Sequence, residues 1–177
     1  MENSVVMPSE EQPKLTHQEI VNLFVITLAD VYTSKSCLMI LLPSIVCKTT
    51  SNELKFTILN LGTIINGQRI RLRLAIMLLQ KGAEPKDIIG NLDLDKFLHG
   101  HVGEKSIETD AIILTHLIVA EAIEIASFKL LSDLAVNLYP RTVAALMNLS
   151  LKEAIDSKRT LENLLTNSYL IPARCGA

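Results

Sequence analysis

The side chains with the clearest potential for binding chemistry are three arginines in one short stretch. Arg69, Arg71 and Arg73 alternate with apolar residues, and Lys81 follows them without an intervening acid. In a helix, Arg69 and Arg73 share a face one turn apart, whereas Arg71 points roughly to the opposite side. Guanidinium groups bind phosphate through paired hydrogen bonds. The sequence therefore predicts that Arg69, Arg73 and Lys81 contact a nucleic-acid backbone.

The competing interpretation is that these basic residues pair with the acidic segment that follows them. Between residues 84 and 110, acidic side chains outnumber lysines, and such neighbouring charge runs are often neutralised within the fold. The formal net charge of −2 provides no general attraction for a polyanion. Both interpretations stay open at the level of sequence.

Glu121 and Glu124 are unusual because they lie one turn apart in an otherwise apolar segment. Bundles that hold two metal ions combine such acids with Glu-x-x-His motifs, which this chain lacks. We therefore expect these glutamates to form a salt bridge with an arginine or to mark where the helix reaches the surface. The histidine pair His99 and His101 has no third ligand at a regular spacing.

Sequence motifs for catalysis are also missing. The chain contains no phosphate-binding loop, dinucleotide fingerprint, nucleophile elbow or zinc signature. We therefore predict a protein that is not an enzyme, with no metal, no cofactor and no small-molecule substrate.

The fold class follows from a long apolar segment. Residues 106–132 contain neither proline nor glycine and are apolar on nearly every side, which is typical of a helix surrounded by neighbours. We predict one all-α helical-bundle domain over residues 16–170, with seven to nine helices around this buried central helix. Residues 1–15 form a flexible N-terminal arm and residues 171–177 a C-terminal tail in this interpretation.

Local signals set the expected helix boundaries. Thr16 and Glu19 form a capping box at the first helix, Pro43 is expected to kink or end the second helix, and Asn66-Gly67 predicts a turn between two antiparallel helices. Ser150 and Glu153 form a second capping box, which predicts the start of the last helix. The expected helices are 16–32, 34–42, 52–65, 68–81, 85–91, 93–99, 106–132, 133–147 and 150–167.

Composition and the N-terminus point to an intracellular protein. The apolar runs 20–32, 37–47 and 111–126 are shorter than the roughly 18 residues that a membrane span needs. The N-terminus lacks the features of a signal peptide, and three cysteines without metal-like spacing suit a reducing compartment. We expect a cytoplasmic location, with the nucleus not excluded.

The sequence leaves three hypotheses for function. The leading one is a viral, nucleocapsid-associated assembly protein, which self-associates through its arm and an exposed apolar helix face and binds RNA through the basic residues. The second is an adaptor that binds a partner helix in an apolar groove. The third is a helix-turn-helix regulator that reads DNA with residues 85–99.

Overall fold

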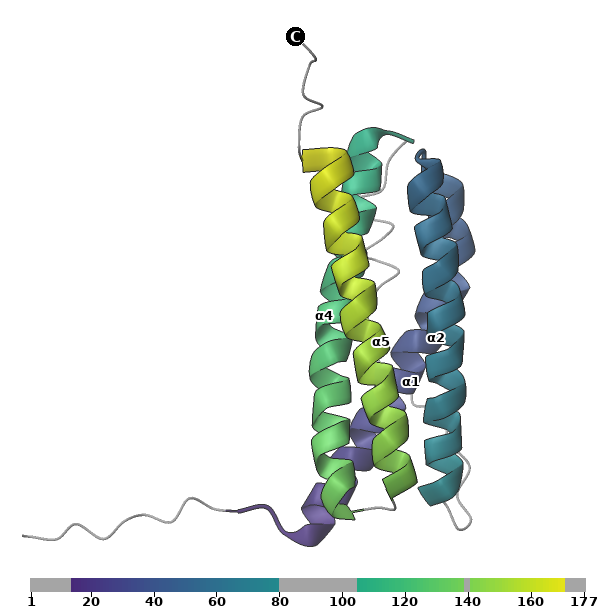
Figure 1. Ribbon diagram of the computed structural model, residues 1–177. Helices are drawn as coiled ribbons and strands as arrows, with labels where there is room; N and C mark the ends of the chain where they lie inside the picture. Colours follow the sequence, from purple (N-terminus) through teal and green to yellow (C-terminus); the bar gives the residue numbers. More distant parts are fainter. Residues whose placement is uncertain (1–13, 80–104, 139–140, 171–177) are drawn as a thin grey trace, which may run out of the picture.

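The structure is a bundle of long helices (Figure 1). The computed structural model describes residues 14–79, 105–138 and 141–170. Within these ranges the chain forms four α-helices and one short π-helical turn, η1, and no strand. Their bounds are α1 His17–Lys48, α2 Asn52–Leu79, α4 Ile107–Leu138, α5 Arg141–Leu165 and η1 Thr166–Leu170. The all-α prediction is confirmed, whereas the described ranges contain four α-helices and do not support the predicted seven to nine.

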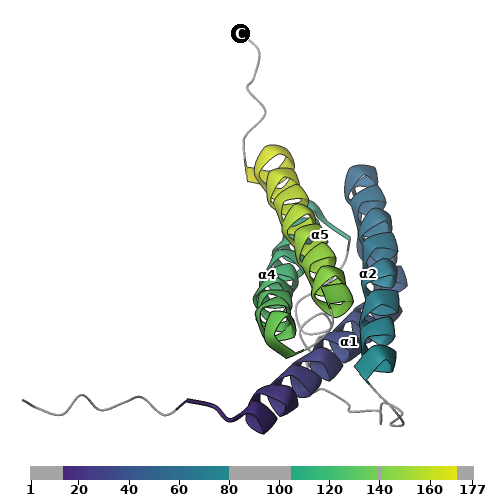
Figure 2. The same ribbon diagram turned by 60° about the horizontal axis from the view of Figure 1, so that its bottom comes forward.

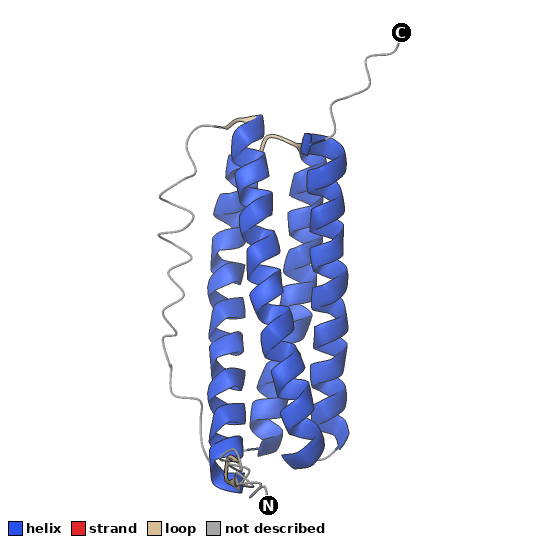
Figure 3. Ribbon diagram, turned by 90° about the vertical axis from the view of Figure 1, so that its left-hand side faces the viewer, coloured by secondary structure: helices blue, strands red, loops and turns tan. Residues whose placement is uncertain are grey.

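The helices form a closed ring in which α1 and α5 each contact both α2 and α4. The short turn between Lys48 and Asn52 makes α1 and α2 antiparallel, and α4 and α5 are antiparallel as well (Figures 1 and 3). Because α2 and α4 run in the same direction, the connection between them joins opposite ends of the bundle. Figures 1 and 2 show that α1 is inclined, so that it starts near α4 and ends behind α2.

The number of helices is lower than expected because residues that were expected to end a helix lie inside continuous helices. The Thr16 capping box is present as predicted, but α1 then continues through Pro43 to Lys48. Similarly, α2 passes through Asn66 and Gly67 without a turn. Both helices keep a buried apolar face on either side of these positions, and this packing outweighs the local preference. The expected helices 85–91 and 93–99 lie outside the described residues.

The long apolar segment forms a helix, but not the central helix. α4 begins within one residue of the predicted start and extends beyond 132. It is one of four helices around a shared core, and its outer face is exposed, with Ile107 exposed by 73% and Val119 by 45%. In the described part of the chain, no further helix covers this face. The apolar residues on its outer side were therefore misinterpreted as a sign of complete burial.

The interior consists of two hydrophobic clusters that a polar layer separates. One cluster includes Phe24, Leu72, Phe128 and Met147, and the other includes Leu38, Ile58, Leu117 and Leu161. Along each helix, the change from one cluster to the other occurs at an inward-facing polar residue. These buried residues are Lys35 on α1, Gln68 on α2, Glu121 and Glu124 on α4, and Ser157 on α5.

Asp110 closes one end of the bundle. Its fully buried carboxylate accepts hydrogen bonds of 2.9 Å from the backbone N–H groups of Thr50 and Ser51, directly before α2. It also accepts from the Tyr169 hydroxyl at 3.3 Å. Burial alone would raise the pKa of Asp110, but the hydrogen bonds from Thr50, Ser51 and Tyr169 outweigh it and lower the pKa. One side chain of α4 therefore connects the α1–α2 turn to η1.

Replacing Asp110 by alanine is expected to lower the free energy of unfolding by about 1–3 kcal/mol, because the backbone N–H groups of Thr50 and Ser51 lose their acceptor. This contribution is present at pH values above the unfolded pKa of 3.8 and is lost as the pH falls through the lower folded pKa. Urea unfolding of both proteins at several pH values measures it. Asp133→Ala, at an exposed position of the same helix, is the control. Equal stability of the two variants at neutral pH would contradict this assignment.

Candidate functional site

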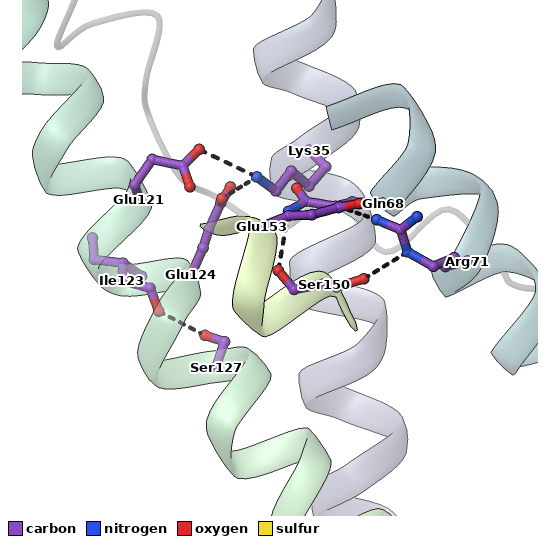
Figure 4. Close-up of polar contacts among 9 residues, drawn as sticks. All are labelled: Lys35, Gln68, Arg71, Glu121, Ile123, Glu124, Ser127, Ser150 and Glu153. Carbon is purple, nitrogen blue, oxygen red and sulfur yellow. Dashed lines mark hydrogen bonds and ion pairs between the residues drawn. The ribbon is translucent and has the colours of Figure 1, made fainter. Parts of the chain in front are cut away.

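The most unusual chemistry of the molecule lies in the polar layer at the centre of the bundle. Lys35 is fully buried and forms ion pairs with Glu121 and Glu124, which are exposed by only 1% and 5%. The Lys35 Nζ atom lies 3.5 Å from Glu121 Oε1, and its contact with Glu124 is closer. Figure 4 shows the lysine reaching from α1 towards both carboxylates of α4. One ammonium group is thus placed against two buried carboxylates.

Helical spacing explains why these side chains meet. Lys35 lies four residues after Val31 and three before Leu38, so it belongs to the inward face of α1. Glu121 and Glu124 likewise lie between the buried residues Leu117 and Phe128 on α4. Burying one uncompensated charge would be very unfavourable, and the pairing of α1 with α4 provides the opposite charge for each partner.

The carboxyl groups do not share the ammonium equally. Burial raises the pKa of Glu121 to about 7, the positive charge of Lys35 opposes this rise, and the neighbouring Glu124 adds to it. Burial also raises the pKa of Glu124, against the effect of Lys35. Because two carboxylates face one cation, the group is electrically neutral when the pair of glutamates holds one additional proton between them.

A second polar network joins α2 to α5 beside this layer (Figure 4). The buried Gln68 donates to the backbone oxygen of Ser150 at 3.2 Å. Arg71 donates to the Ser150 hydroxyl at 3.0 Å and forms an ion pair with Glu153. Ser150 and Glu153 therefore lie within α5 and bind Arg71, instead of forming the capping box that the sequence predicted.

Two of the three residues predicted to bind nucleic acid, Arg69 and Arg73, lie in the described part of the chain and have different surroundings. Arg69 is partly buried, donates to the Ser36 hydroxyl at 3.1 Å and lies over the Tyr32 ring, 5.9 Å from its centroid. Arg73 is exposed, and Lys81 lies outside the described residues. Arg71 is neutralised by α5 and not by the acidic segment after it.

Sequence reasoning identified Glu121 and Glu124 as unusual but missed their partner. We expected an arginine or an exposed position, whereas the cation is Lys35 and the site is buried. A signal was present, because Lys35 is the one charged residue between residues 31 and 47. A lone lysine in an apolar helical stretch indicates a buried cation that needs an acidic partner.

Comparison with known proteins places the chain in a family. A family described as a domain of unknown function, DUF892, matches residues 19–171. The chain belongs to this family. No curated protein matches the chain.

Two solved structures share the fold. The E. coli stress protein YciF has a TM-score of 0.76 and 23% identity, covering 84% of this chain and 95% of its own. YcfI, described as a putative structural protein from Rhodopseudomonas palustris, has a TM-score of 0.68 and 20% identity, covering 89% of this chain and 98% of its own. At these identities the likeness establishes the common architecture.

The expectation of a viral, RNA-binding protein is corrected by these comparisons. The similar structures come from bacteria and are described as a stress protein and a structural protein. The prediction from the basic residues failed because the spacing of charges in the sequence does not show which arginines form contacts within the bundle.

Two of the described helices are also long and apolar enough to cross a membrane by length and composition, namely α1 and α4. The sequence-based expectation of no spanning segment depended on apolar runs shorter than a span, and on α1 two such runs lie on either side of the buried Lys35. In the bundle, these apolar helices supply the inner faces of the two clusters. Helices at the core of a water-soluble bundle have the same composition.

Replacing Lys35 by methionine is expected to lower the free energy of unfolding by about 3–5 kcal/mol, because the glutamates lose their buried counter-charge. Chemical denaturation at neutral pH measures this loss. Adding Glu121→Gln and Glu124→Gln to the variant should recover much of it, since neutral amides need no cation. Lys129→Met, at an exposed position on α4, is the control and should change stability by about 0.5 kcal/mol or less. Similar losses in the two single variants would contradict the assigned ion pairs.

The Glu121 carboxyl is expected to make stability depend on pH near neutrality. Its pKa is raised from 4.5 to about 7, so between these values the folded protein holds a proton that the unfolded chain has lost. The contribution of Glu121 to the free energy of unfolding should therefore fall as the pH rises through this window, by at most about 1.4 kcal/mol per pH unit. The charged groups nearby are Lys35 and Glu124, with the Arg71–Glu153 pair on α2 and α5.

Urea unfolding at a series of pH values tests this dependence when the protein is compared with Glu121→Gln. The difference in free energy between the two proteins should vary with pH across the window and become constant above it. A difference that does not change with pH would show that Glu121 does not hold the additional proton.

Proposed function

We propose that this chain is a non-catalytic association protein that binds a second copy of itself through the outer face of α4. The observation that carries this proposal is an exposed apolar surface without charge. Between Asp110 and Lys129, the only charged residues of α4 are Glu121 and Glu124, and both face inward. We define the α4 outer face by its exposed large apolar residues Val119 and Ile123, which lie within this stretch.

A second copy of the chain suits this face better than a charged partner. Burying an apolar, charge-free surface against a similar surface is favourable, because water is removed from both. Such a surface has no charges with which a charged partner could form ion pairs. A two-fold contact between identical faces also satisfies the symmetry that most soluble oligomers adopt. Identical α4 outer faces can therefore cover each other.

The size of the surface indicates that a neighbouring helix contributes. The part of α4 between Asp110 and Lys129 is roughly 27 Å long and about 10 Å wide, so α4 alone offers on the order of 270 Å². Stable dimers bury about 800 Å² on each partner. The adjacent helix α1 also exposes apolar residues, Ile26 and Ile40. The proposed interface therefore extends from α4 to α1.

The proposal that the protein is non-catalytic has separate support. The buried carboxylates, which would be the natural acid–base groups, are engaged with Lys35. The description of YcfI as a putative structural protein is consistent with such a role.

Two further parts of the proposal concern the adaptor hypothesis and the location. Between α2 and α5, a shallow depression of about 270 Å³ is lined by residues such as Leu61, Ile64 and Leu161. It is smaller than a typical ligand pocket and offers little room for a partner helix, which favours self-association.

We place the protein in the cytoplasm because Cys37 and Cys47 are free thiols, as a reducing compartment would keep them.

A charge introduced into the α4 outer face is expected to dissociate the assembly. Size-exclusion chromatography with light scattering, over a range of concentrations, should show an oligomer for the unchanged protein and a monomer for Ile123→Lys, because a desolvated ammonium would lie in the interface. Ile155→Lys on α5 is a matched control, since Ile155 is exposed by 47% and Ile123 by 48%. A monomeric unchanged protein, or an oligomer insensitive to Ile123→Lys, would overturn the proposal.

A further inference from the structure

The polar layer occupies the position that related architectures give to metal ions. Four-helix bundles with one connection between opposite ends include the di-iron carboxylate proteins, which hold their metals at the bundle centre with inward-facing glutamates and Glu-x-x-His motifs. In this chain, all four helices also direct polar side chains to the centre, between the two hydrophobic clusters. The layer can therefore be compared helix by helix with a metal site.

The residues of this layer do not fit a metal of that kind. Where di-metal bundles have a ligand on each helix, α1 provides the ammonium of Lys35, α2 the amide of Gln68 and α5 the hydroxyl of Ser157. Only α4 provides carboxylates, as Glu121-x-x-Glu124, without the histidine. Two carboxylates and neutral oxygens are far fewer charged donors than di-iron sites use.

The position of the Lys35 ammonium group is also unfavourable for binding a metal ion. Its Nζ atom lies 3.5 Å from Glu121 Oε1 and forms an ion pair with Glu124, so both carboxylates converge on it. A divalent ion bound to the same oxygens would lie about 2.0–2.2 Å from them. It would therefore be within a few ångströms of a positive charge, in a buried place where repulsion is only weakly screened.

We propose that Lys35 supplies, from within the chain, the cation that bundles of this connectivity take from bound metal, and that it excludes metal ions from the bundle centre. The bundle then keeps its central charge balance regardless of the supply of iron, manganese or zinc. This proposal concerns the interior of each chain and is independent of the proposed self-association.

The test compares the full-length protein with variants after removal of metals by a chelator. Each protein is titrated with Zn²⁺, Mn²⁺ or, without oxygen, Fe²⁺. The readouts are the thermal unfolding temperature and the metal retained after gel filtration. For the unchanged protein, the unfolding temperature should not change. Any metal retained should be the same in the Glu121→Gln, Glu124→Gln double variant, since it would then be bound elsewhere. Stoichiometric metal that stabilises the unchanged protein and is lost in the double variant would overturn the proposal.

Replacing the ammonium should create a metal site. Lys35→Glu places a third carboxylate beside Glu121 and Glu124, so metal should raise its unfolding temperature and bind at least about tenfold more tightly than to the unchanged protein. Lys35→Gln removes the charge without adding repulsion, and it serves as the second variant if Lys35→Glu does not fold. Lys129→Glu, on the exposed side of α4, should remain indifferent to metal. If the folded Lys35 variants also bind no metal and keep their unfolding temperature when metal is added, Lys35 is not the group that excludes the metal.

Discussion

The ammonium group of Lys35 provides the positive charge that two buried carboxylates require, and the arrangement of the helices depends on it. Because Glu121 and Glu124 are almost completely buried, they require a cation at their own level. This requirement fixes how α1 and α4 are aligned. A shift of one turn along α4 would place Lys35 between one glutamate and Leu117 or Phe128, and would leave the other buried glutamate without its cation. Buried charges of this kind contribute little net stability, but they can specify a single register.

Polar contacts at other levels complete the alignment. Arg71 and Gln68 connect α2 to Ser150 on α5, beside the central layer. At one end, Asp110 connects α4 to the turn before α2 and to Tyr169. All of these contacts join residues that are distant in sequence. The aliphatic clusters supply most of the buried area, while the polar contacts determine which helices meet and at which height.

The features that the sequence predicts correctly are those with short-range causes. The capping box of Thr16 and Glu19 marks the start of α1, and the absence of proline and glycine marks the long helix that becomes α4. The number of helices was overestimated because packing carries α1 through Pro43 and α2 through Gly67. The glutamates could be identified as unusual from their apolar surroundings. Their pairing with Lys35, and the contact of Arg69 with the Tyr32 ring, depend on which helices are neighbours, and no local pattern encodes that.

The polar layer has a further consequence for how the folded chain can fluctuate. Because it separates two hydrophobic clusters, each half of the bundle has its own core, with Phe24 and Phe128 in one half and Ile58 and Leu161 in the other. The two clusters are connected by the helices that cross the layer and by the charged residues within it. We therefore expect local opening of one half to leave most apolar contacts of the other half in place, so that the two halves can differ in local stability.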